Sequence, residues 1–352
     1  MTTDNNYIQH LHAFRGFAIL NVVGAHAWSF MIFWTGGLNN DAIPWLFWLT
    51  ETIFHGSTLY FAIISGVLFS LVLKQKSWRS FYRSKLMYVI APYLVMSLFL
   101  TAYYWQYISQ QASIDNSLVG FMKVAANSVI FGKADIHFWY IPVLAVLFLL
   151  TPLLKHLTTS HKFIVWGLLL APLVISRSPF PDFLKVQSFV YFACAYFLGM
   201  VVGQYYEDVK AFVSRYWAWL VWAMIVCSCA LYALYHHNYQ VSGMFSIRQS
   251  LVYVQKVIIA LLMLYWLSKI EMKLPQWLNS LGSYAFAIFF MHVVFMGFVI
   301  QFARSSVEVN RTVATIALYG SLSFLVAIIG SIAVAWTMKK LFKKRSRILI
   351  GA

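Results

Sequence analysis

The chain of 352 residues is 61% hydrophobic and 18% aromatic, and only 10% of its residues are charged. Soluble domains contain about 25% charged residues, so this composition excludes a soluble globular enzyme and predicts an integral membrane protein. The formal net charge of +16 does not indicate a nucleic-acid partner, because most Lys and Arg residues lie in alternate connections between apolar segments, as the positive-inside rule describes. The three cysteines show no metal-ligand spacing, so no metal is expected.

Apolar segments long enough to cross about 30 Å of hydrocarbon recur along the whole chain. Ten are predicted, over residues 13–35, 44–73, 86–107, 138–154, 162–177, 186–204, 216–236, 248–267, 280–303 and 312–338. The stretch 118–131 is apolar but short, and it is predicted to be an interfacial or re-entrant helix on the outer face. We therefore expect an all-α, polytopic protein with about ten transmembrane helices and both termini in the cytoplasm.

The predicted spans form one transmembrane domain over residues 1–338, followed by a basic cytoplasmic tail over 339–352. The Lys and Arg residues of this tail, between Lys339 and Arg347, are interpreted as a topology determinant beside anionic lipid headgroups. No other domain, repeat or low-complexity segment is evident.

Arg15 and His26 lie in the first span, eleven residues apart. Eleven residues make about three helical turns and roughly 16 Å, so both side chains lie on one stripe. Ionisable residues within a span are costly and commonly mark a functional path. The alternatives are a snorkelling interfacial cation for Arg15 and a packed, hydrogen-bonded histidine for His26.

Other polar residues within the spans each have two possible roles. Glu51 and His55 are four residues apart and form either an orienting carboxylate–histidine pair or a solvated pair at the membrane surface. His292 is either catalytic or part of an interhelical hydrogen bond, and Lys256 either binds an anion or pairs structurally. Ser65, beside a glycine, suggests a covalent acyl-serine, but helix packing by small residues is favoured.

Five short motifs occur in a fixed order along the chain. They lie at residues 15–20 followed by His26, and at 59–68, 91–93, 137–141 and 283–292. Together they resemble the signatures of the bacterial membrane acyltransferase family called acyltransferase 3. One departure is Tyr88, where the family usually has an Arg, and Lys85 one helical turn earlier is the candidate to supply that charge.

The resemblance implies transfer of an acetyl or succinyl group from a cytoplasmic donor to a glycan hydroxyl at the outer face of the bacterial inner membrane. Acyl-coenzyme A, most simply acetyl-coenzyme A, is then a co-substrate, and no permanently bound cofactor is expected. The other partners are a glycan or lipid-linked saccharide acceptor, membrane lipids and the polysaccharide-synthesis machinery.

The predicted site residues fall into three groups. His26 is the expected general base, with His292, Glu51 and His55 as supporting catalytic residues; Arg15, Lys85 and Ser65 are expected at the donor, and His137, Trp139 and Lys256 at the acceptor. Each role combines the chemistry of the residue with its place in a motif or span.

Two other classes of function fit the composition. A transporter could export a glycan intermediate or a small anion, but the sequence shows no evident inverted repeat and no paired Gly- or Pro-broken helices, which argues modestly against it. A structural or regulatory partner of a polysaccharide-synthesis complex would leave the buried charges unexplained.

Overall fold

The protein is described by a computed structural model that covers residues 8–34, 44–111, 115–179, 181–237, 244–309 and 312–352. These residues are helical or irregular, with no strand among them. Nine helices in this part of the chain are long and apolar enough to cross a membrane. The predicted all-α, polytopic membrane fold is confirmed.

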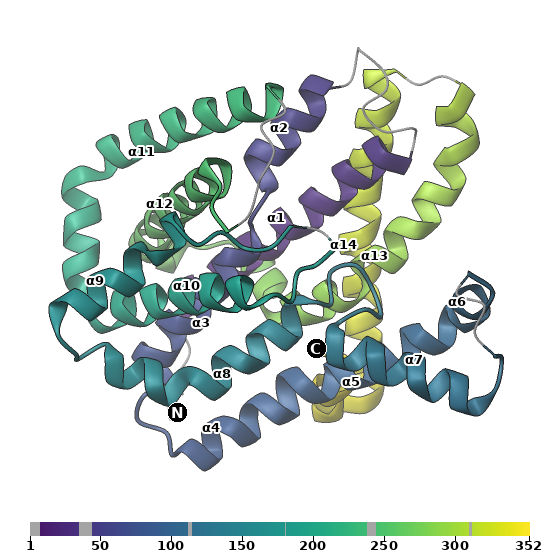
Figure 1. Ribbon diagram of the computed structural model, residues 1–352, viewed down its shortest axis with the longest axis horizontal. Helices are drawn as coiled ribbons and strands as arrows, with labels where there is room; N and C mark the ends of the chain where they lie inside the picture. Colours follow the sequence, from purple (N-terminus) through teal and green to yellow (C-terminus); the bar gives the residue numbers. More distant parts are fainter. Residues whose placement is uncertain (1–7, 35–43, 112–114, 180, 238–243, 310–311) are drawn as a thin grey trace.

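The helices surround a central α1 in a bundle (Figure 1). Their bounds are α1 Gln9–Trp34, α2 Pro44–Phe54, α3 Thr58–Leu68, α4 Trp78–Lys85, α5 Ala91–Tyr103, α6 Trp105–Gln111, α7 Leu118–Phe131, α8 Tyr140–Leu157, α9 Lys162–Leu170, α10 Val186–Gln204, α11 Tyr206–His236, α12 Ile247–Lys269, α13 Gln276–Val309, α14 Val313–Phe342 and α15 Ser346–Leu349. Short π-helical (η1 Phe69–Leu73, η2 Leu86–Ile90) and 3₁₀ (η3 Ala171–Leu173, η4 Glu271–Lys273, η5 Lys343–Arg345) turns extend or join them.

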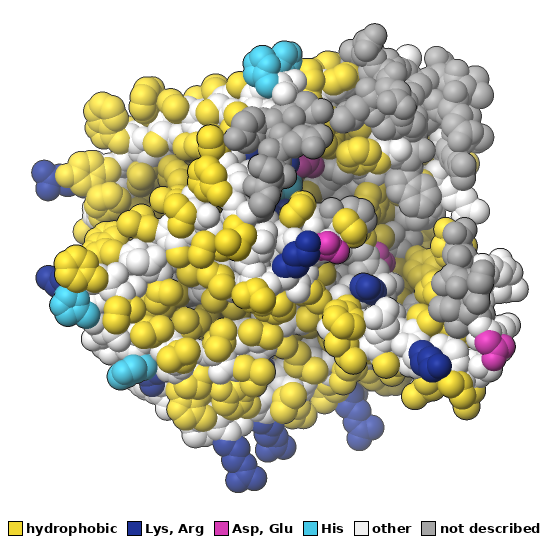
Figure 2. Space-filling view, in the orientation of Figure 1, with side chains coloured by type: hydrophobic (Ala, Val, Ile, Leu, Met, Phe, Trp, Pro, Cys, Tyr) yellow, Lys and Arg dark blue, Asp and Glu magenta, His cyan; other side chains and the backbone are white. Residues whose placement is uncertain are grey.

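Hydrophobic side chains cover most of the visible surface, and a group of Lys and Arg side chains projects from its lower edge (Figure 2). Such an apolar exterior suits contact with lipid. The predicted short helix over 118–131 is present as α7, and it packs against α5, where the Tyr93 hydroxyl donates to the carbonyl oxygen of Val129 at 2.5 Å.

Glycines bring the backbones of α1 and α13 into direct contact. A Cβ atom added at Gly16 would lie 2.5 Å from the carbonyl oxygen of Leu278, and one at Gly282 would overlap the carbonyl of His12. Gly66 and Gly199 allow the same close approach of α3 and α10. Small residues at helix crossings are the usual means of close packing in membranes, and the packing interpretation of the Ser65–Gly66 pair fits this contact.

The second span is broken in its middle. α2 ends at Phe54, Gly56 has a left-handed φ of +76°, and α3 begins at Thr58. The break leaves backbone carbonyls without helical partners, and α12 supplies donors: Gln255 Nε2 donates to the Thr52 carbonyl at 3.1 Å and Lys256 Nζ to the Ile53 carbonyl at 2.6 Å. The predicted span over 44–73 is therefore present as two helices joined at Gly56.

The predicted span over 162–177 is not one continuous helix. α9 and η3 contain nine and three residues and together rise about 18 Å, which is less than the hydrocarbon thickness. Trp139 before α8 stacks on Phe183 before α10, with ring centroids 4.5 Å apart. Because these helices therefore start at the same end of the bundle, the chain between them must return across it.

Non-helical backbone completes this return. The Ser176 amide donates to the Met244 carbonyl at 2.8 Å, and the Leu173 carbonyl accepts from Ser250 Oγ at 2.7 Å. Irregular backbone at membrane depth requires such internal partners. The span differs from the expectation because its helix ends early at Leu173 and the following residues pack against the start of α12.

The α1–α13 contact yields a stability prediction. We expect Gly282→Ala to lower the free energy of unfolding by about 1–3 kcal/mol or more, because its methyl group overlaps the backbone of α1. Gly297→Ala on the same helix is the control, since no atom lies within 4 Å of a Cβ there, and it should be neutral or gain up to about 1 kcal/mol in helix propensity. Unfolding in mixed detergent micelles measures both, and equal stability of the two variants would contradict the contact.

Candidate active site

Three histidines from distant parts of the chain form a cluster at the centre of the bundle. His26 comes from α1, His137 from the turn before α8, and His292 from α13. The ring centroids lie 5.3 Å apart for His26 and His292, 4.4 Å for His137 and His292, and 6.1 Å for His26 and His137. His137 and His292 are buried, while His26 is partly exposed. His26 is therefore the least buried ring of the three.

Hydrogen bonds define the tautomer of His292. Its Nδ1 lies 2.9 Å from the carbonyl oxygens of Ile288 and of Phe289. Since carbonyl oxygens only accept, Nδ1 carries a proton, and in the neutral ring Nε2 then has the lone pair. Nε2 has no hydrogen-bond partner among the described residues. His292 thus offers a buried acceptor to a hydroxyl group or to another imidazole.

Asp135 is a carboxylate beside this cluster that the sequence analysis missed. Its Oδ1 lies 3.6 Å from Nδ1 of His137, and its side chain is 8% exposed. At this distance the two groups are neighbours but do not form a hydrogen bond. The position of Asp135 two residues before His137 was the available signal.

Glu51 and His55 belong to a second polar cluster, on the α2 side of the bundle. Glu51 Oε2 lies 2.7 Å from His55 Nδ1, and Arg177 Nη2 lies 2.7 Å from His55 Nε2. Gln249 Nε2 is a further donor, 3.2 Å from the same nitrogen. Because a guanidinium only donates, His55 accepts at Nε2 and donates to Glu51 at Nδ1. In a hydrolase triad the distal nitrogen faces the nucleophile instead.

This second cluster is neither solvated nor isolated. The side chains of Glu51 and His55 are only 17% and 20% exposed, which does not fit a solvated surface pair. Ser29, one helical turn beyond His26, places its hydroxyl 3.5 Å from Glu51 Oε1. The structure thus brings Glu51 next to the α1 turn that follows His26, without ring contact between the two clusters. Arg177, in the broken fifth span, carried no sequence signal.

A basic cavity of about 1080 Å³ contains all three predicted donor residues, Arg15, Lys85 and Ser65. The Arg15 guanidinium lies 5.5 Å from the centre of the Phe286 ring, and Lys85 Nζ lies 4.4 Å from that of Phe148. The cations that line it are Arg15, Lys85, Lys339, Lys343, Lys344 and Arg347, and no acidic side chain occurs among the described residues of its wall. The cavity therefore suits a polyanionic ligand.

The inner end of the basic cavity approaches the histidine cluster. Tyr140 and Phe289 both line the cavity, and the Phe289 ring centroid lies 4.9 Å from that of His137. One layer of aromatic side chains thus separates the cavity from the three histidines.

Two predicted acceptor residues, Trp139 and Lys256, lie outside the cluster. Trp139 is 8% exposed and stacks on Phe183, with Arg177 6.0 Å from each ring. Lys256 is completely buried and donates to the Ile53 carbonyl, which is the structural pairing among its two alternatives. Only His137 of the three predicted acceptor residues contacts the other histidines.

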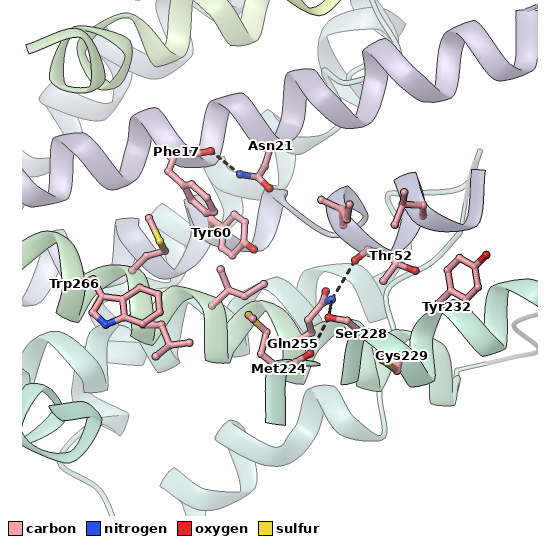
Figure 3. A pocket seen from close by; sticks show the side chains of 15 residues that line it. Phe17, Asn21, Thr52, Tyr60, Met224, Ser228, Cys229, Tyr232, Gln255 and Trp266 are labelled. Atoms are coloured by element: carbon pink, nitrogen blue, oxygen red, sulfur yellow. Dashed lines mark hydrogen bonds between the residues drawn. The ribbon is translucent and has the colours of Figure 1, made fainter. Parts of the chain in front are cut away.

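A second pocket, of about 630 Å³, lies between α1, α2, α11 and α12 (Figure 3). Its wall is mainly apolar, from Trp266 at one end to Tyr232 at the other. Gln255 lies in this wall, and its Nε2 donates to Thr52 O and, at 2.8 Å, to Ser228 Oγ. None of the site residues predicted from the sequence lines this pocket.

Residues 8–339 match the family model of acyltransferase 3, which is described as an acyltransferase domain. The chain belongs to the acyltransferase 3 family. This acyltransferase 3 protein is therefore a multi-pass membrane acyltransferase, and the resemblance inferred from its five motifs is confirmed. The matched range contains every predicted site residue. No significant match was found among curated proteins or solved structures.

The position of Lys256 yields a second prediction. Lys256→Met should destabilise the fold by about 1–3 kcal/mol, because the Ile53 carbonyl loses its donor within the bundle. Lys269→Met, at the exposed end of the same helix, is the matched control and should change little. Thermal unfolding in detergent measures both, and a Lys256→Met protein of normal stability but without acyl transfer would indicate a catalytic role instead.

Proposed function

We propose that this acyltransferase transfers an acyl group, most simply acetyl with succinyl as the alternative, from acyl-coenzyme A to a sugar hydroxyl of a surface or exported polysaccharide. The membrane is the bacterial inner membrane, and the acceptor is a glycan or lipid-linked saccharide at the outer side. One observation carries the proposal: the histidine cluster lies between a cavity rich in cations and a buried polar cluster built around Glu51.

The donor is expected in the basic cavity, with its phosphates on Arg15 and Lys85. Arg pairs bidentately with phosphate, and Lys adds a point charge. Arg15 lies eleven residues before His26 on α1, roughly 16 Å along the helix. An extended pantetheine arm covers a comparable distance, so a thioester can reach the depth of the histidines while the phosphates stay at Arg15. Contact with the histidines then requires the aromatic layer of Tyr140 and Phe289 to move aside.

His26 is the proposed general base because it is the partly exposed member of the cluster. Its neutral imidazole removes the proton from the acceptor hydroxyl as the oxygen attacks the thioester carbonyl. When the tetrahedral intermediate collapses, the carbon–sulfur bond breaks, and the coenzyme A thiolate leaves and takes up the proton from the imidazolium. His292 Nε2 is available to accept a hydrogen bond from His26 or from the acceptor.

Family membership favours this enzyme over the transporter, although the break in the second span is a feature that transporters also use. The capped carbonyls of Thr52 and Ile53 give that break a structural function. No export step is needed to explain it.

Replacement of His26 tests the base. His26→Gln should lower the rate of acetyl transfer by about 10²-fold or more, because general base catalysis contributes that much, while acetyl-coenzyme A still binds. The assay uses purified protein in nanodiscs, labelled acetyl-coenzyme A and candidate glycans. His156→Gln, an exposed histidine at the end of α8, is the control. Transfer by His26→Gln at the wild-type rate would refute the assignment.

Replacement of Arg15 tests the donor site. Arg15→Gln should raise KM for acetyl-coenzyme A roughly ten- to hundredfold, since a hydrogen bond to a charged group contributes about 1.5–3 kcal/mol. Arg83→Gln removes an exposed cation of α4 that does not line the cavity, and its KM should match the wild type. Steady-state kinetics at varied donor concentration measures both, and an unchanged KM for Arg15→Gln would exclude the phosphate contact.

A further inference from the structure

The basic segment after α14 folds back onto the bundle. α14 ends at Phe342, and Lys343 has a left-handed φ of 49° that reverses the chain. Residues 343–352 then form η5 and α15, which pack against α5 and α14. Ser346 and Ile350 are buried at 1% and 5% exposure. Of the predicted basic tail, residues 339–342 belong to α14, and residues 343–352 are folded against the bundle.

This folded segment adds cations to the cavity that contains Arg15 and Lys85. Lys343, Lys344 and Arg347 line the cavity, and all three are exposed. Arg15 and Lys85 are instead only partly exposed and pack on aromatic rings. The cavity thus has cations at two levels, an inner pair within the helices and an outer, exposed group that comprises the three of the folded segment and Lys339 at the end of α14.

Arg347 lies against η2 at this outer level. Its guanidinium carbon is 4.5 Å from the centre of the Tyr88 ring, close enough for a cation–π contact that holds the side chain over the cavity. A guanidinium held by a ring keeps its N–H donors free for a phosphate. Arg347 lies beyond the range matched by the family model, which ends at residue 339.

We propose that residues 343–352 form the mouth of the donor site and that Arg347, supported by Lys343 and Lys344, binds the 3′-phosphate of coenzyme A. This inference rests on the proposed function. The pyrophosphate of coenzyme A lies between its pantetheine arm and its nucleotide. If the pyrophosphate is held by Arg15 and Lys85, the nucleotide must extend outward from them, and the cations present there are those of the folded segment together with Lys339 of α14. A phosphate of an anionic lipid is the other ligand of the same chemistry.

Binding of two donors tests the inference. Dissociation constants are measured by calorimetry in phosphatidylcholine nanodiscs for acetyl-coenzyme A and for acetyl-dephospho-coenzyme A, which lacks the 3′-phosphate. Arg347→Gln should raise the dissociation constant of acetyl-coenzyme A about tenfold and leave that of acetyl-dephospho-coenzyme A nearly unchanged. Arg345→Gln, an exposed arginine two residues away that does not line the cavity, should bind both donors as the wild type does.

A second variant and a second lipid composition serve as further tests. If the melting temperature of Arg347→Gln shows that it does not fold, the double variant Lys343→Gln/Lys344→Gln replaces it. This variant should likewise weaken the binding of acetyl-coenzyme A and leave the binding of acetyl-dephospho-coenzyme A nearly unchanged. The alternative ligand, an anionic lipid, is tested by measuring how tightly each protein associates with phosphatidylglycerol in nanodiscs. If Arg347→Gln weakens this lipid association and leaves the binding of both donors unchanged, the inference is overturned.

Failure of the proposed function and failure of the role given to residues 343–352 lead to different results. Wild-type protein that neither binds acetyl-coenzyme A nor transfers acetyl refutes the proposed function, and this inference with it. Wild-type protein that binds and transfers, with Arg347→Gln and the double variant indistinguishable from it on both donors, refutes only the role of the folded segment.

Discussion

The direct backbone contact between α1 and α13 determines where the reactive groups lie. Gly16 and Gly282 mark this contact, and each is followed ten residues later by a histidine, at positions 26 and 292. Ten residues rise about 15 Å in any α-helix, so two helices that start from a common contact and run in the same direction bring those histidines to the same depth. Their rings are in fact 5.3 Å apart. Side chains larger than hydrogen at the contact would separate the helices and the histidines together.

The absence of water in the hydrocarbon imposes the second constraint. Every polar group that leaves a regular helix needs a partner within the protein. Lys256 and Gln255 satisfy the carbonyls at the break after α2, and α12 and its preceding residues satisfy the non-helical return after η3. These two breaks place His55 and Arg177 within hydrogen-bond distance. The irregular segments therefore build the polar cluster that straight helices would have kept apart.

The two ends of the site differ in chemistry as the proposed reaction requires. The cavity on the Arg15 side is lined by cations and aromatic rings, which suits a phosphate-bearing donor. On the other side, Glu51, His55, Arg177 and Gln249 contact one another, and Gln249 Oε1 has no hydrogen-bond partner among the described residues, which leaves an acceptor for the hydroxyl of a polar ligand. His26 lies between the two regions and is the least buried histidine of the central cluster. In the proposed reaction, donor and acceptor meet there.

Composition and the recurrence of apolar segments determined the membrane class and the all-α fold, because the hydrocarbon thickness fixes the length of a span and permits helices within it. The spacing of Arg15 and His26 could be predicted too, since positions on one helix follow from its pitch. The partners of these residues could not. His137 and His292 join His26, Arg177 joins His55, and Arg347 reaches Tyr88. These contacts join residues that are far apart in the chain, and chain reversals, helix breaks and glycine contacts determine them. A periodic sequence pattern indicates which face of its own helix is buried, but not which residues of other helices pack against that face. The tertiary structure alone therefore decided which polar side chains contact one another.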